Sequence, residues 1–495
     1  MRHSVPQWYR DAKLGILVRW GVPSVPAYAP SEYGGPLEIL RSHNGRFYFQ
    51  NHPDAQWYLN SLRIGDSPVH RYHRKHYGGY TAYERFARRF NEELPHWDPT
   101  RWADQFREAG ARYVVMTAKH HDGFLLWPTE VSPVSPAFVA QRDVVGELAK
   151  AVRALGMRYG VSYSGLLDWT VQTRPIRDFA DVRLAKCPGD YPDYVAAHLT
   201  ELIGRTAADV LRLEGGVPRG LARSIPRAYR ETVADGVLQG SWRQSPALGR
   251  AILGSPPGRR LLSGRIRAAM LASPRAGRRP FFTGDVPTVE YPAPVARRTN
   301  PWEYVRGLGR SSGYNASEPA GSYLTGVDLV HLLADVVSKN GNLLLSVAPA
   351  LDGSLCPEQR EPLAVLARWL ATHREAIYGT RPWRRPEGTT ADGLPVRFTA
   401  RANTLYAIVL GRPRMLSIEF PDLDLDRIPR SEATADDEFE VRVLGLERSV
   451  SWHEEGRGVV IDLPGSFVPQ EAIVVEFAWR TAAGRRASSF FTDLV

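Results

Sequence analysis

The sequence has only two cysteines, Cys187 and Cys356, among 495 residues. Two cysteines are too few for a disulfide framework and lack the spacing of a metal site, so we assign both to ordinary packing. Long apolar runs are also missing, because no stretch approaches eighteen uninterrupted apolar residues, and we therefore expect no membrane span. From the first residues, MRHSVPQWYRDAKLGIL, we expect no cleavable signal sequence. We expect a cytoplasmic protein.

Negative charge is in short supply relative to positive charge. Lys and Arg number 63 against 53 Asp and Glu, for a net charge of +10. Much of the excess lies between residues 219 and 279, where many arginines face only Glu231 and Asp235. Such charge suits an anionic partner. No recognised nucleic-acid module or interleaved aromatic residues accompany it, so we do not expect nucleic-acid binding.

The chain is long enough, with 43% apolar residues, to bury a large core and to form about two domains. Strand-like runs alternate with amphipathic helical stretches such as 101–109 and 144–154. In the second stretch, Val145, Leu148, Val152 and Leu155 recur at helical spacing. The alternation predicts a (β/α)₈-type barrel of parallel strands. The strand-like runs are 14–18, 113–117, 158–163, 210–213, 236–239 and 343–347.

The character of the sequence changes after Trp383. A polar, glycine-bearing linker is followed by short alternating strands, which predict an antiparallel domain. We expect a barrel domain over residues 1–383 and a C-terminal β-sandwich over 384–495. Residues 246–280, rich in Gly, Pro, Arg and Ala, read as a partly helical insertion in a barrel loop that could act as a mobile lid. The alternating apolar positions are Val396, Phe398, Leu405, Ala407, Val409, Leu416 and Ile418.

The most informative segment is residues 113–127, YVVMTAKHHDGFLLW. A buried-strand pattern runs directly into Lys119, His120, His121 and Asp122, where a β/α barrel carries its active-site loops. A histidine pair can also be satisfied in a core without any chemical role. The neighbouring motifs decide between the two readings.

This segment resembles the α-L-fucosidases, glycoside hydrolase family twenty-nine, and further blocks of the chain match that family in order. Together they span about residues 8 to 385. The resemblance implies a β/α barrel followed by a β-sandwich, a glycosidase that retains anomeric configuration, a sugar or glycoside as partner, and no metal or organic cofactor. The other blocks are 8–25, 97–110, 142–148, 160–169, 191–202, 302–315, 337–349 and 376–383.

A retaining glycosidase needs two carboxylates about 5 to 5.5 Å apart. The family carries its nucleophile as an Asp in a block similar to DVLW-x-D-G, and residues 209–216 read DVLRLEGG, which places Glu214 at that position. Glutamate reaches roughly 1.3 Å further, whereas productive sites tolerate about 0.5 Å. Either the backbone at Gly215 and Gly216 has moved or the nucleophile is displaced. A charged rim residue in an inactive site is the alternative.

Glu290, in the block Thr288-Val289-Glu290-Tyr291, resembles the general acid/base of the family. Glu303 is the competing candidate. It belongs to a block that recurs in the family, so a structural role is equally open to it. We favour Glu290.

Several substrate contacts of the family also have counterparts. His120 and His121 match the two histidines of the family's KHHDG block, and Tyr163 matches a tyrosine of its YYSG block. Arg19 stands where the family has a histidine, and brings a permanent charge and five donors that would suit an anionic ligand. Ser241 replaces a later arginine. The neighbouring tryptophans Trp20 and Trp242 remain.

We therefore expect a divergent, bacterial-type α-L-fucosidase homologue. Its substrate would be an α-L-fucoside or a modified or anionic sugar glycoside of small size, in specialised metabolism. The alternative is a repurposed homologue that binds a ligand or performs non-hydrolytic chemistry in a biosynthetic pathway. Hydrolysis of an aryl α-L-fucoside would distinguish the two. An oligomer is compatible with the sequence.

Overall fold

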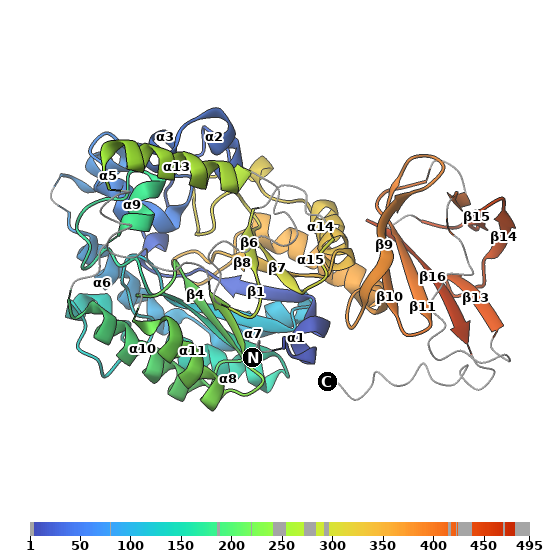
Figure 1. Ribbon diagram of the computed structural model, residues 1–495, viewed down its shortest axis with the longest axis horizontal. Helices are drawn as coiled ribbons and strands as arrows, with labels where there is room; N and C mark the ends of the chain where they lie inside the picture. Colours follow the sequence, from blue (N-terminus) through green and yellow to red (C-terminus); the bar gives the residue numbers. More distant parts are fainter. Residues whose placement is uncertain are drawn as a thin grey trace.

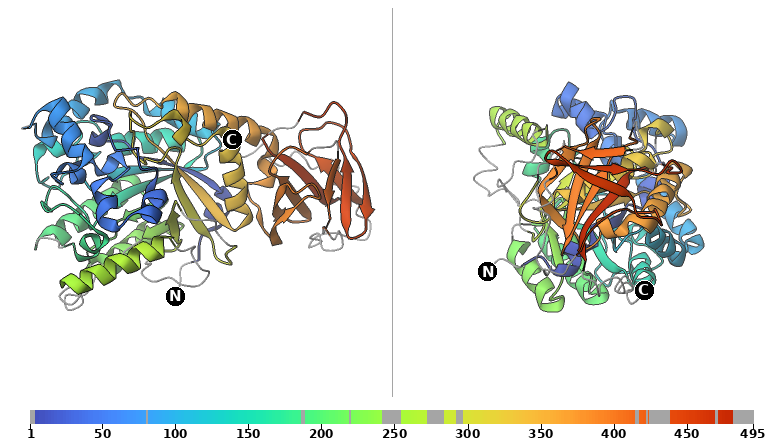
Figure 2. Two further views of the ribbon diagram at one scale, coloured as in Figure 1. Left: turned by 90° about the horizontal axis from the view of Figure 1, so that it is seen from above. Right: turned by 90° about the vertical axis from the view of Figure 1, so that its right-hand side faces the viewer.

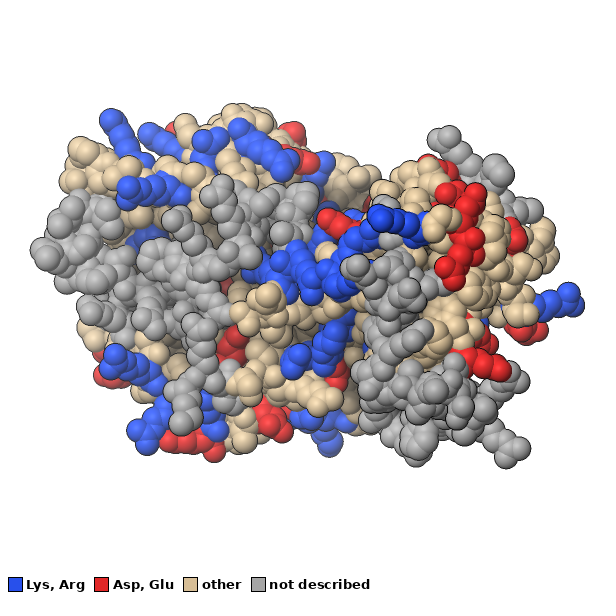
Figure 3. Space-filling view, turned by 45° about the vertical axis from the view of Figure 1, so that its right-hand side comes forward, with Lys and Arg blue, Asp and Glu red and all other residues tan. Residues whose placement is uncertain are grey.

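The computed structural model describes residues 4–79, 81–185, 189–218, 220–240, 254–271, 284–291, 297–413, 417–421, 423, 438–468 and 471–480. Parallel strands and the helices around them lie at one end of the long axis, and antiparallel sheets lie at the other (Figures 1 and 2). Lys and Arg side chains gather along the middle of one face, beside acidic side chains of the C-terminal sheets (Figure 3).

The first sheet has eight strands, in the order β5-β4-β3-β2-β1-β8-β7-β6, with every neighbouring pair parallel. The sheet is nearly closed. The segment before β6 runs along β5, where Asp285 N donates to Leu238 O at 2.7 Å and Asp285 Oδ2 accepts from Leu238 N at 2.9 Å. The strands are β1 (Leu14–Val18), β2 (Tyr113–Lys119), β3 (Arg158–Ser164), β4 (Val210–Glu214), β5 (Val237–Gly240), β6 (Thr288–Glu290), β7 (Trp302–Gly307) and β8 (Gly341–Val347).

The predicted barrel is confirmed, and all six predicted strands are present. Strands β6 and β7 were missed. β6 has only three residues, and β7 carries Glu303 and Arg306 between its apolar residues, which hides a strand pattern.

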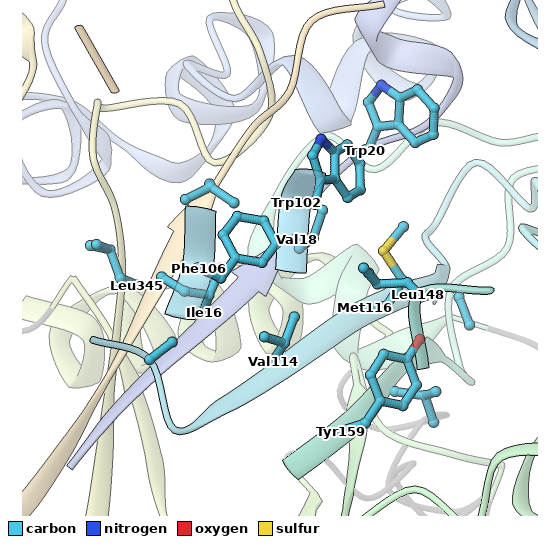
Figure 4. Close-up of a cluster of buried hydrophobic side chains, with 14 of the residues drawn as sticks. Ile16, Val18, Trp20, Trp102, Phe106, Val114, Met116, Leu148, Tyr159 and Leu345 are labelled. Carbon is cyan, nitrogen blue, oxygen red and sulfur yellow. The ribbon is translucent and has the colours of Figure 1, made fainter. Parts of the chain in front are cut away.

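Side chains alternate between the two faces of each strand, as the period of two requires. Ile16, Val114 and Leu345 point outward and pack with Phe106 and Leu148 of the surrounding helices (Figure 4). A second set points into the barrel and fills its lower part with apolar side chains. This inner set includes Leu17, Tyr113, Val115, Val210, Val237, Val305 and Leu344.

Helices surround the barrel (Figure 1). The predicted helices at 101–109 and 144–154 appear as α7 and α8. The α-helices are α1 (Gln7–Ala12), α2 (Pro36–Ser42), α3 (Gly45–Gln50), α4 (Tyr58–Leu62), α5 (Pro68–Tyr77), α6 (Tyr83–Glu93), α7 (Pro99–Glu108), α8 (Val144–Ala154), α9 (Phe179–Leu184), α10 (Tyr191–Thr206), α11 (Leu221–Thr232), α13 (Pro256–Leu271), α14 (Gly326–Ser338) and α15 (Pro357–His373). Short 3₁₀ turns are η1 (Val22–Ser24), η2 (Ala55–Trp57), η3 (Leu94–His96), η4 (Pro136–Phe138), η5 (Ala320–Ser322) and η6 (Arg374–Ala376).

Helix α13 is the described part of the arginine-rich segment, so the expectation of partial helix holds there. The helix packs on α9, α2 and α3. Arg259 pairs with Asp181 and Asp178 of the α9 region, and Arg267 Nε donates to Leu40 O at 2.8 Å. These contacts fix the helix beside the N-terminal loops. A lid function for the segment stays a prediction.

The stretch Ala320–Ser338 is long and apolar enough, by length and composition alone, to cross a membrane. Its α-helical part, α14, has only 13 residues, whereas a span needs about 20. Leu329, Leu333 and Val337 of α14 are fully buried, and the helix packs on β8 and α15. These are the contacts of a core helix in a barrel.

The C-terminal part contains two antiparallel sheets that share one apolar core, as expected. The stretch after Trp383 was predicted to be a linker, and this is wrong, because it forms most of β9. β9 also crosses the expected domain boundary between residues 383 and 384. The division of the chain into two domains at that point stays a prediction. Leu416 lies outside the described residues. The sheets are β13-β16-β11-β10-β9 and β12-β15-β14, formed by β9 (Arg381–Thr389), β10 (Pro395–Arg401), β11 (Thr404–Val409), β12 (Ser417–Phe420), β13 (Glu438–Val443), β14 (Ser451–Glu455), β15 (Gly458–Asp462) and β16 (Ile473–Arg480).

Helices α14 and α15 join the two parts. His331 Nε2 contacts Glu471 O at 2.9 Å, and Trp369 Nε1 donates to Ala472 O at 3.0 Å. Asp335 of α14 pairs with Arg397 of β10. Lys339 Nζ also lies 3.3 Å from Glu387 Oε2 of β9. The C-terminal sheets are therefore held to the barrel by hydrogen bonds and ion pairs.

Cys356 adds little to the fold. Cys356 is free and half-buried, and its Sγ accepts a hydrogen bond from Gln359 Nε2 at 3.3 Å. Cys187 lies outside the described residues.

Candidate active site

The predicted site residues meet at the carboxyl-terminal rim of the barrel. Glu214 ends β4, Glu290 ends β6, and Arg19 follows β1. His120 and His121 follow β2. Because the eight strands are parallel, these strand ends share one side of the sheet.

Glu214 is largely buried, with 13% of its side chain exposed. Its Oε1 lies 2.8 Å from Arg19 Nη1 and 3.6 Å from His120 Nε2, and its Oε2 accepts from Ser162 Oγ at 3.3 Å. Burial alone would raise the pKa of Glu214, but Arg19, His120 and Arg212 outweigh burial and hold the pKa well below its ordinary value. Glu214 is therefore an anion at neutral pH.

The backbone turns sharply just after Glu214. Gly215 and Gly216 have φ of 68° and 92°, in the region that other residues rarely adopt. The two glycines therefore supply conformational freedom next to the longer glutamate side chain, as one reading of the sequence required.

Arg19 joins the two carboxylates that the sequence singled out. Its Nη1 pairs with Glu214, and its Nη2 lies 3.9 Å from Glu290 Oε1. Only 4% of the Arg19 side chain is exposed. Burial would lower its pKa, but Glu214, Glu290 and Asp54 raise it further. The guanidinium is charged, and carboxylates of the chain itself compensate that charge.

Glu290 sits at the edge of the same group. Its side chain is 48% exposed, and its Oε1 accepts from Arg212 Nη2 at 2.5 Å. Arg212 belongs to β4 and lies two residues before Glu214, so strand alternation directs both side chains into the barrel. Glu214 and Glu290 thus approach one guanidinium from two strands.

Glu303 lies deeper, and no part of it is exposed. Its Oε2 accepts from Tyr9 Oη at 2.6 Å, Tyr113 Oη at 2.8 Å and Gln239 Nε2 at 2.8 Å. Burial raises the pKa of Glu303 although Arg212 and these three donors oppose the rise. A carboxyl enclosed in this way favours the structural role that the sequence left open for Glu303.

The two histidines lie with their ring centroids 4.2 Å apart. His121 Nδ1 contacts Ser164 Oγ at 2.6 Å, and that hydroxyl donates to Leu167 O at 2.7 Å. Ser164 must therefore accept from Nδ1–H, which leaves His121 Nε2 as an acceptor. Burial and the neighbouring His120 hold the pKa of His121 well below its ordinary value, so this ring is neutral.

Buried charges support the histidine loop from behind. Lys119 Nζ lies 2.7 Å from Asp168 Oδ2, and both side chains are fully buried. Lys119 also donates to Ser164 O at 2.9 Å. Asp122 accepts from Tyr83 Oη at 3.0 Å. The outer residues of the KHHD motif, Lys119 and Asp122, therefore anchor the loop, and the two histidines between them face the site.

His120, His121 and Glu214 offer donor atoms that all lie within 4.8 Å of one another, a spacing that could hold a metal ion. Arg19 Nη1 already contacts Glu214 Oε1, the same oxygen that faces His120. A cation there would meet the guanidinium at close range, so the donor set fits a metal poorly.

A cavity of about 320 Å³ lies elsewhere on the barrel, lined by Arg101, Gln105, Tyr314, Arg360 and residues 350–357 apart from Leu351 and Asp352. It contains none of the predicted site residues.

The sequence matches the family described as α-L-fucosidase over residues 1–375. The chain belongs to the α-L-fucosidase family. The tissue α-L-fucosidases of Mus musculus and Homo sapiens are 28% and 27% identical to it, over 96% of this chain and 91% and 88% of those proteins. The Thermotoga maritima α-fucosidase bound to a mechanism-based inhibitor is 34% identical, with a TM-score of 0.76 and coverage of 96% and 97%. The complex of the same enzyme with fucose is 34% identical to this chain, with a TM-score of 0.75 and the same coverage.

Family membership makes the chain a glycosidase and confirms the predicted fold. The segment 113–127, which carried the resemblance, places His120 and His121 at the rim of the barrel.

Two residues expected to bind substrate in this family member point away from the site. Trp20 packs among Phe90, Trp97 and Trp102, and its Nε1 donates to Ala350 O at 2.7 Å. Tyr163 is fully buried, with its hydroxyl 3.0 Å from His198 Nδ1. Neighbouring residues of an extended chain face opposite sides, so an inward Arg19 directs Trp20 outward and an inward Ser162 directs Tyr163 outward. A role of either residue in substrate binding stays a prediction. Ser241 and Trp242 lie outside the described residues.

Other residues of the site were missed at the level of sequence. Arg212 was visible as a charge inside an apolar strand run, two positions before Glu214, and this spacing could have identified it. Trp57 lies edge-on to His121 at 5.5 Å and stacks on His52 at 4.5 Å. No strand pattern marks Trp57, because it belongs to a loop turn. Asp54, in the same loop, accepts from Ser312 Oγ and from Gly313 N at 3.1 Å.

Proposed function

We propose that the chain hydrolyses α-L-fucosides of small molecules with retention of configuration, using Glu214 as nucleophile and Glu290 as general acid/base. The observation that carries the proposal is the pairing of a buried, ionised Glu214 with a half-exposed Glu290 around Arg19. Both carboxylates come from strand ends at the active face of a barrel that belongs to this family.

In the first step a carboxylate oxygen of Glu214 attacks the anomeric carbon, and Glu290 gives a proton to the departing glycosidic oxygen. In the second step Glu290 takes a proton from water, which attacks the anomeric carbon and releases Glu214. Nearby donors and acceptors would hold the sugar hydroxyls, among them His120 and the Nε2 acceptor of His121.

The geometry favours a neutral fucoside over an anionic sugar. An unpaired buried guanidinium would call for an anionic ligand, but Arg19 is already compensated by Glu214 and Glu290. Arg212 is paired in the same way, with Glu290 and Glu303, so it adds no support to the anionic alternative. Calorimetry with fucose and with a fucose phosphate, at two salt concentrations, separates them. Tighter, salt-sensitive binding of the phosphate would favour the anionic sugar.

The proposal includes a cytoplasmic setting in a bacterium and a small glycoside of specialised metabolism. The scarcity of cysteine is compatible with a reducing compartment. Fractionation of the source cells, with detection of the chain by antibody, tests the location.

The decisive experiment is turnover of an aryl α-L-fucoside. Glu214→Gln should lower kcat by orders of magnitude, because it removes the attacking carboxylate. Glu214→Gly should regain part of the activity when azide or formate is added, because a small anion can take the place of the carboxylate.

Turnover of Glu214→Gln within about threefold of the unaltered chain would remove Glu214 from the nucleophile role. Absence of hydrolysis by the unaltered chain, together with fucose binding, would favour the alternative of a repurposed, non-hydrolytic homologue.

A further inference from the structure

We propose that Arg212 is a positioning residue that holds the Glu290 carboxylate in the site by anchoring it to the barrel interior. The inference rests on the proposed function, because it concerns the acid/base residue of that reaction. In this proposal Arg212 acts through Glu290 and not on the reacting atoms.

Arg212 spans two depths of the barrel. It is 5% exposed, its Nη2 donates to Glu290 Oε1 at 2.5 Å, and its Nη1 lies 3.7 Å from Glu303 Oε1. Three donors fix Glu303 through its other oxygen. The guanidinium therefore has a rigid inner partner and a half-exposed outer partner.

Glu290 needs such an anchor more than Glu214 does. It ends β6, a strand of three residues that lies at the edge of the described sheet and pairs with β7. Its side chain is 48% exposed, and Arg19 lies 3.9 Å away while holding Glu214 at 2.8 Å. A half-exposed glutamate loses rotamer freedom when it is held in one position. A charge-assisted hydrogen bond from a fixed guanidinium can offset that loss.

A purely structural role for Arg212 would be to neutralise the buried Glu303. The distances favour the other role, because the contact to Glu290 is a hydrogen bond whereas 3.7 Å to Glu303 is an ion pair without one. The two roles predict different kinetics, since only Glu290 is proposed to transfer a proton.

The test compares alkyl and nitrophenyl α-L-fucosides as substrates of Arg212→Met. Only the poor alkyl leaving group needs protonation, so kcat on the alkyl substrate should fall about tenfold to a hundredfold, as part of the effect of a general acid. On the nitrophenyl substrate, kcat should fall less than about threefold, and KM should change little on either. Arg212→Lys should restore part of the loss.

A double-mutant cycle with Glu290→Ala separates positioning from support of the core. If Arg212 acts through Glu290, Arg212→Met should cause no further loss on the alkyl substrate in the Glu290→Ala background. Equal losses on both substrates, or additive effects in the cycle, would overturn the proposal. Glu303→Gln is the matched variant for the inner partner. If Glu303→Gln shows the same dependence on the leaving group as Arg212→Met, the proposal is also overturned.

Arg212→Met leaves Glu303 without its cation and can impair folding. The variant Arg212→Met/Glu303→Gln removes both charges and keeps the comparison possible. A crystal structure of either variant should have the Glu290 carboxylate displaced from Arg19 toward solvent. An unchanged carboxylate position would refute the role of Arg212 even in a chain that hydrolyses no fucoside, whereas failure of hydrolysis alone refutes only the proposed function.

Discussion

The ion pair between Arg19 and Glu214 should be a large single contribution to barrel stability. The side chains are 4% and 13% exposed and their charged atoms lie 2.8 Å apart. At an effective dielectric constant of about 20, two unit charges at that separation attract by about 6 kcal/mol. Desolvation offsets part of this attraction, but removal of one partner leaves the other charge buried and costs about 3 to 5 kcal/mol.

We expect Arg19→Met and Glu214→Gln each to lower the free energy of unfolding by about 3 kcal/mol, the lower end of that range. His120 at 3.6 Å and Ser162 partly compensate Glu214 when Arg19 is lost, and Glu290 at 3.9 Å partly compensates Arg19 when Glu214 is lost. The double variant has neither charge, so it should cost at least about 2 kcal/mol less than the sum of the singles.

The assay is urea unfolding at pH 7, followed by tryptophan fluorescence and circular dichroism. Coincident transitions justify the use of unfolding free energies. Effects that add within about 0.5 kcal/mol would show that the pair contributes no net coupling, and would refute the reasoning.

The same pair sets a pH dependence. Arg19, His120 and Arg212 overcome the effect of burial and depress the pKa of Glu214 below its ordinary value of 4.5 in the folded chain. The resulting stability is present above 4.5 and is lost as pH falls through the depressed folded value. Arg19→Met should weaken this loss, because the folded and unfolded pKa values of Glu214 then lie closer together.

Glu290→Ala should reduce turnover of alkyl fucosides far more than that of nitrophenyl fucosides, and a stronger leaving-group dependence in Glu303→Ala would reverse the assignment of the acid/base. Burial lowers the pKa of His52 from 6.5 to about 4 in the folded chain. As pH falls, the imidazole is therefore protonated in the unfolded chain before it is protonated in the folded one. Up to about 3 kcal/mol of unfolding free energy is lost between pH 6.5 and pH 4. His52→Gln should flatten urea-unfolding free energies over that interval, and an unchanged slope would contradict the shift. Lys119→Met should lower the free energy of unfolding by about 3 to 5 kcal/mol, because Asp168 is left buried without its cation, and Lys119→Met/Asp168→Asn should lower it less. Thermal and urea unfolding measure both variants, and equal losses in the single and the double variant would argue against a coupled pair.

Much of the barrel could be predicted because its inner strands are apolar and end in polar motifs. β1, β2 and β8 are buried along their whole length, so continuous apolar runs marked them in the sequence. β7 could not be recognised in this way, because the partners of Glu303 come from distant parts of the chain. They are Tyr9, Tyr113, Gln239 and Arg212.

The site was partly predictable for a related reason. Glu214, His120 and His121 follow strands, and their motifs matched a family. Trp20 and Tyr163 were chosen from the same motifs, but side-chain direction alternates along an extended chain, and a motif match does not give the face. The contacts of Arg19 and Arg212 depend on which carboxylates the fold brings within 4 Å, which no local pattern records.

The contacts between the barrel and the C-terminal sheets affect how readily the C-terminal domain could be exchanged by recombination. His331 and Trp369 bind the main-chain carbonyls of Glu471 and Ala472, and every sequence offers such carbonyls. An exchanged C-terminal domain of the same length could therefore keep these two contacts. The pair between Asp335 and Arg397 depends on both side chains. Recombination that separates these two residues would remove the pair, although Asp335 would keep Lys339 and Arg397 would keep Glu387. We therefore expect positions 335 and 397 to change together through descent only where this contact matters for stability.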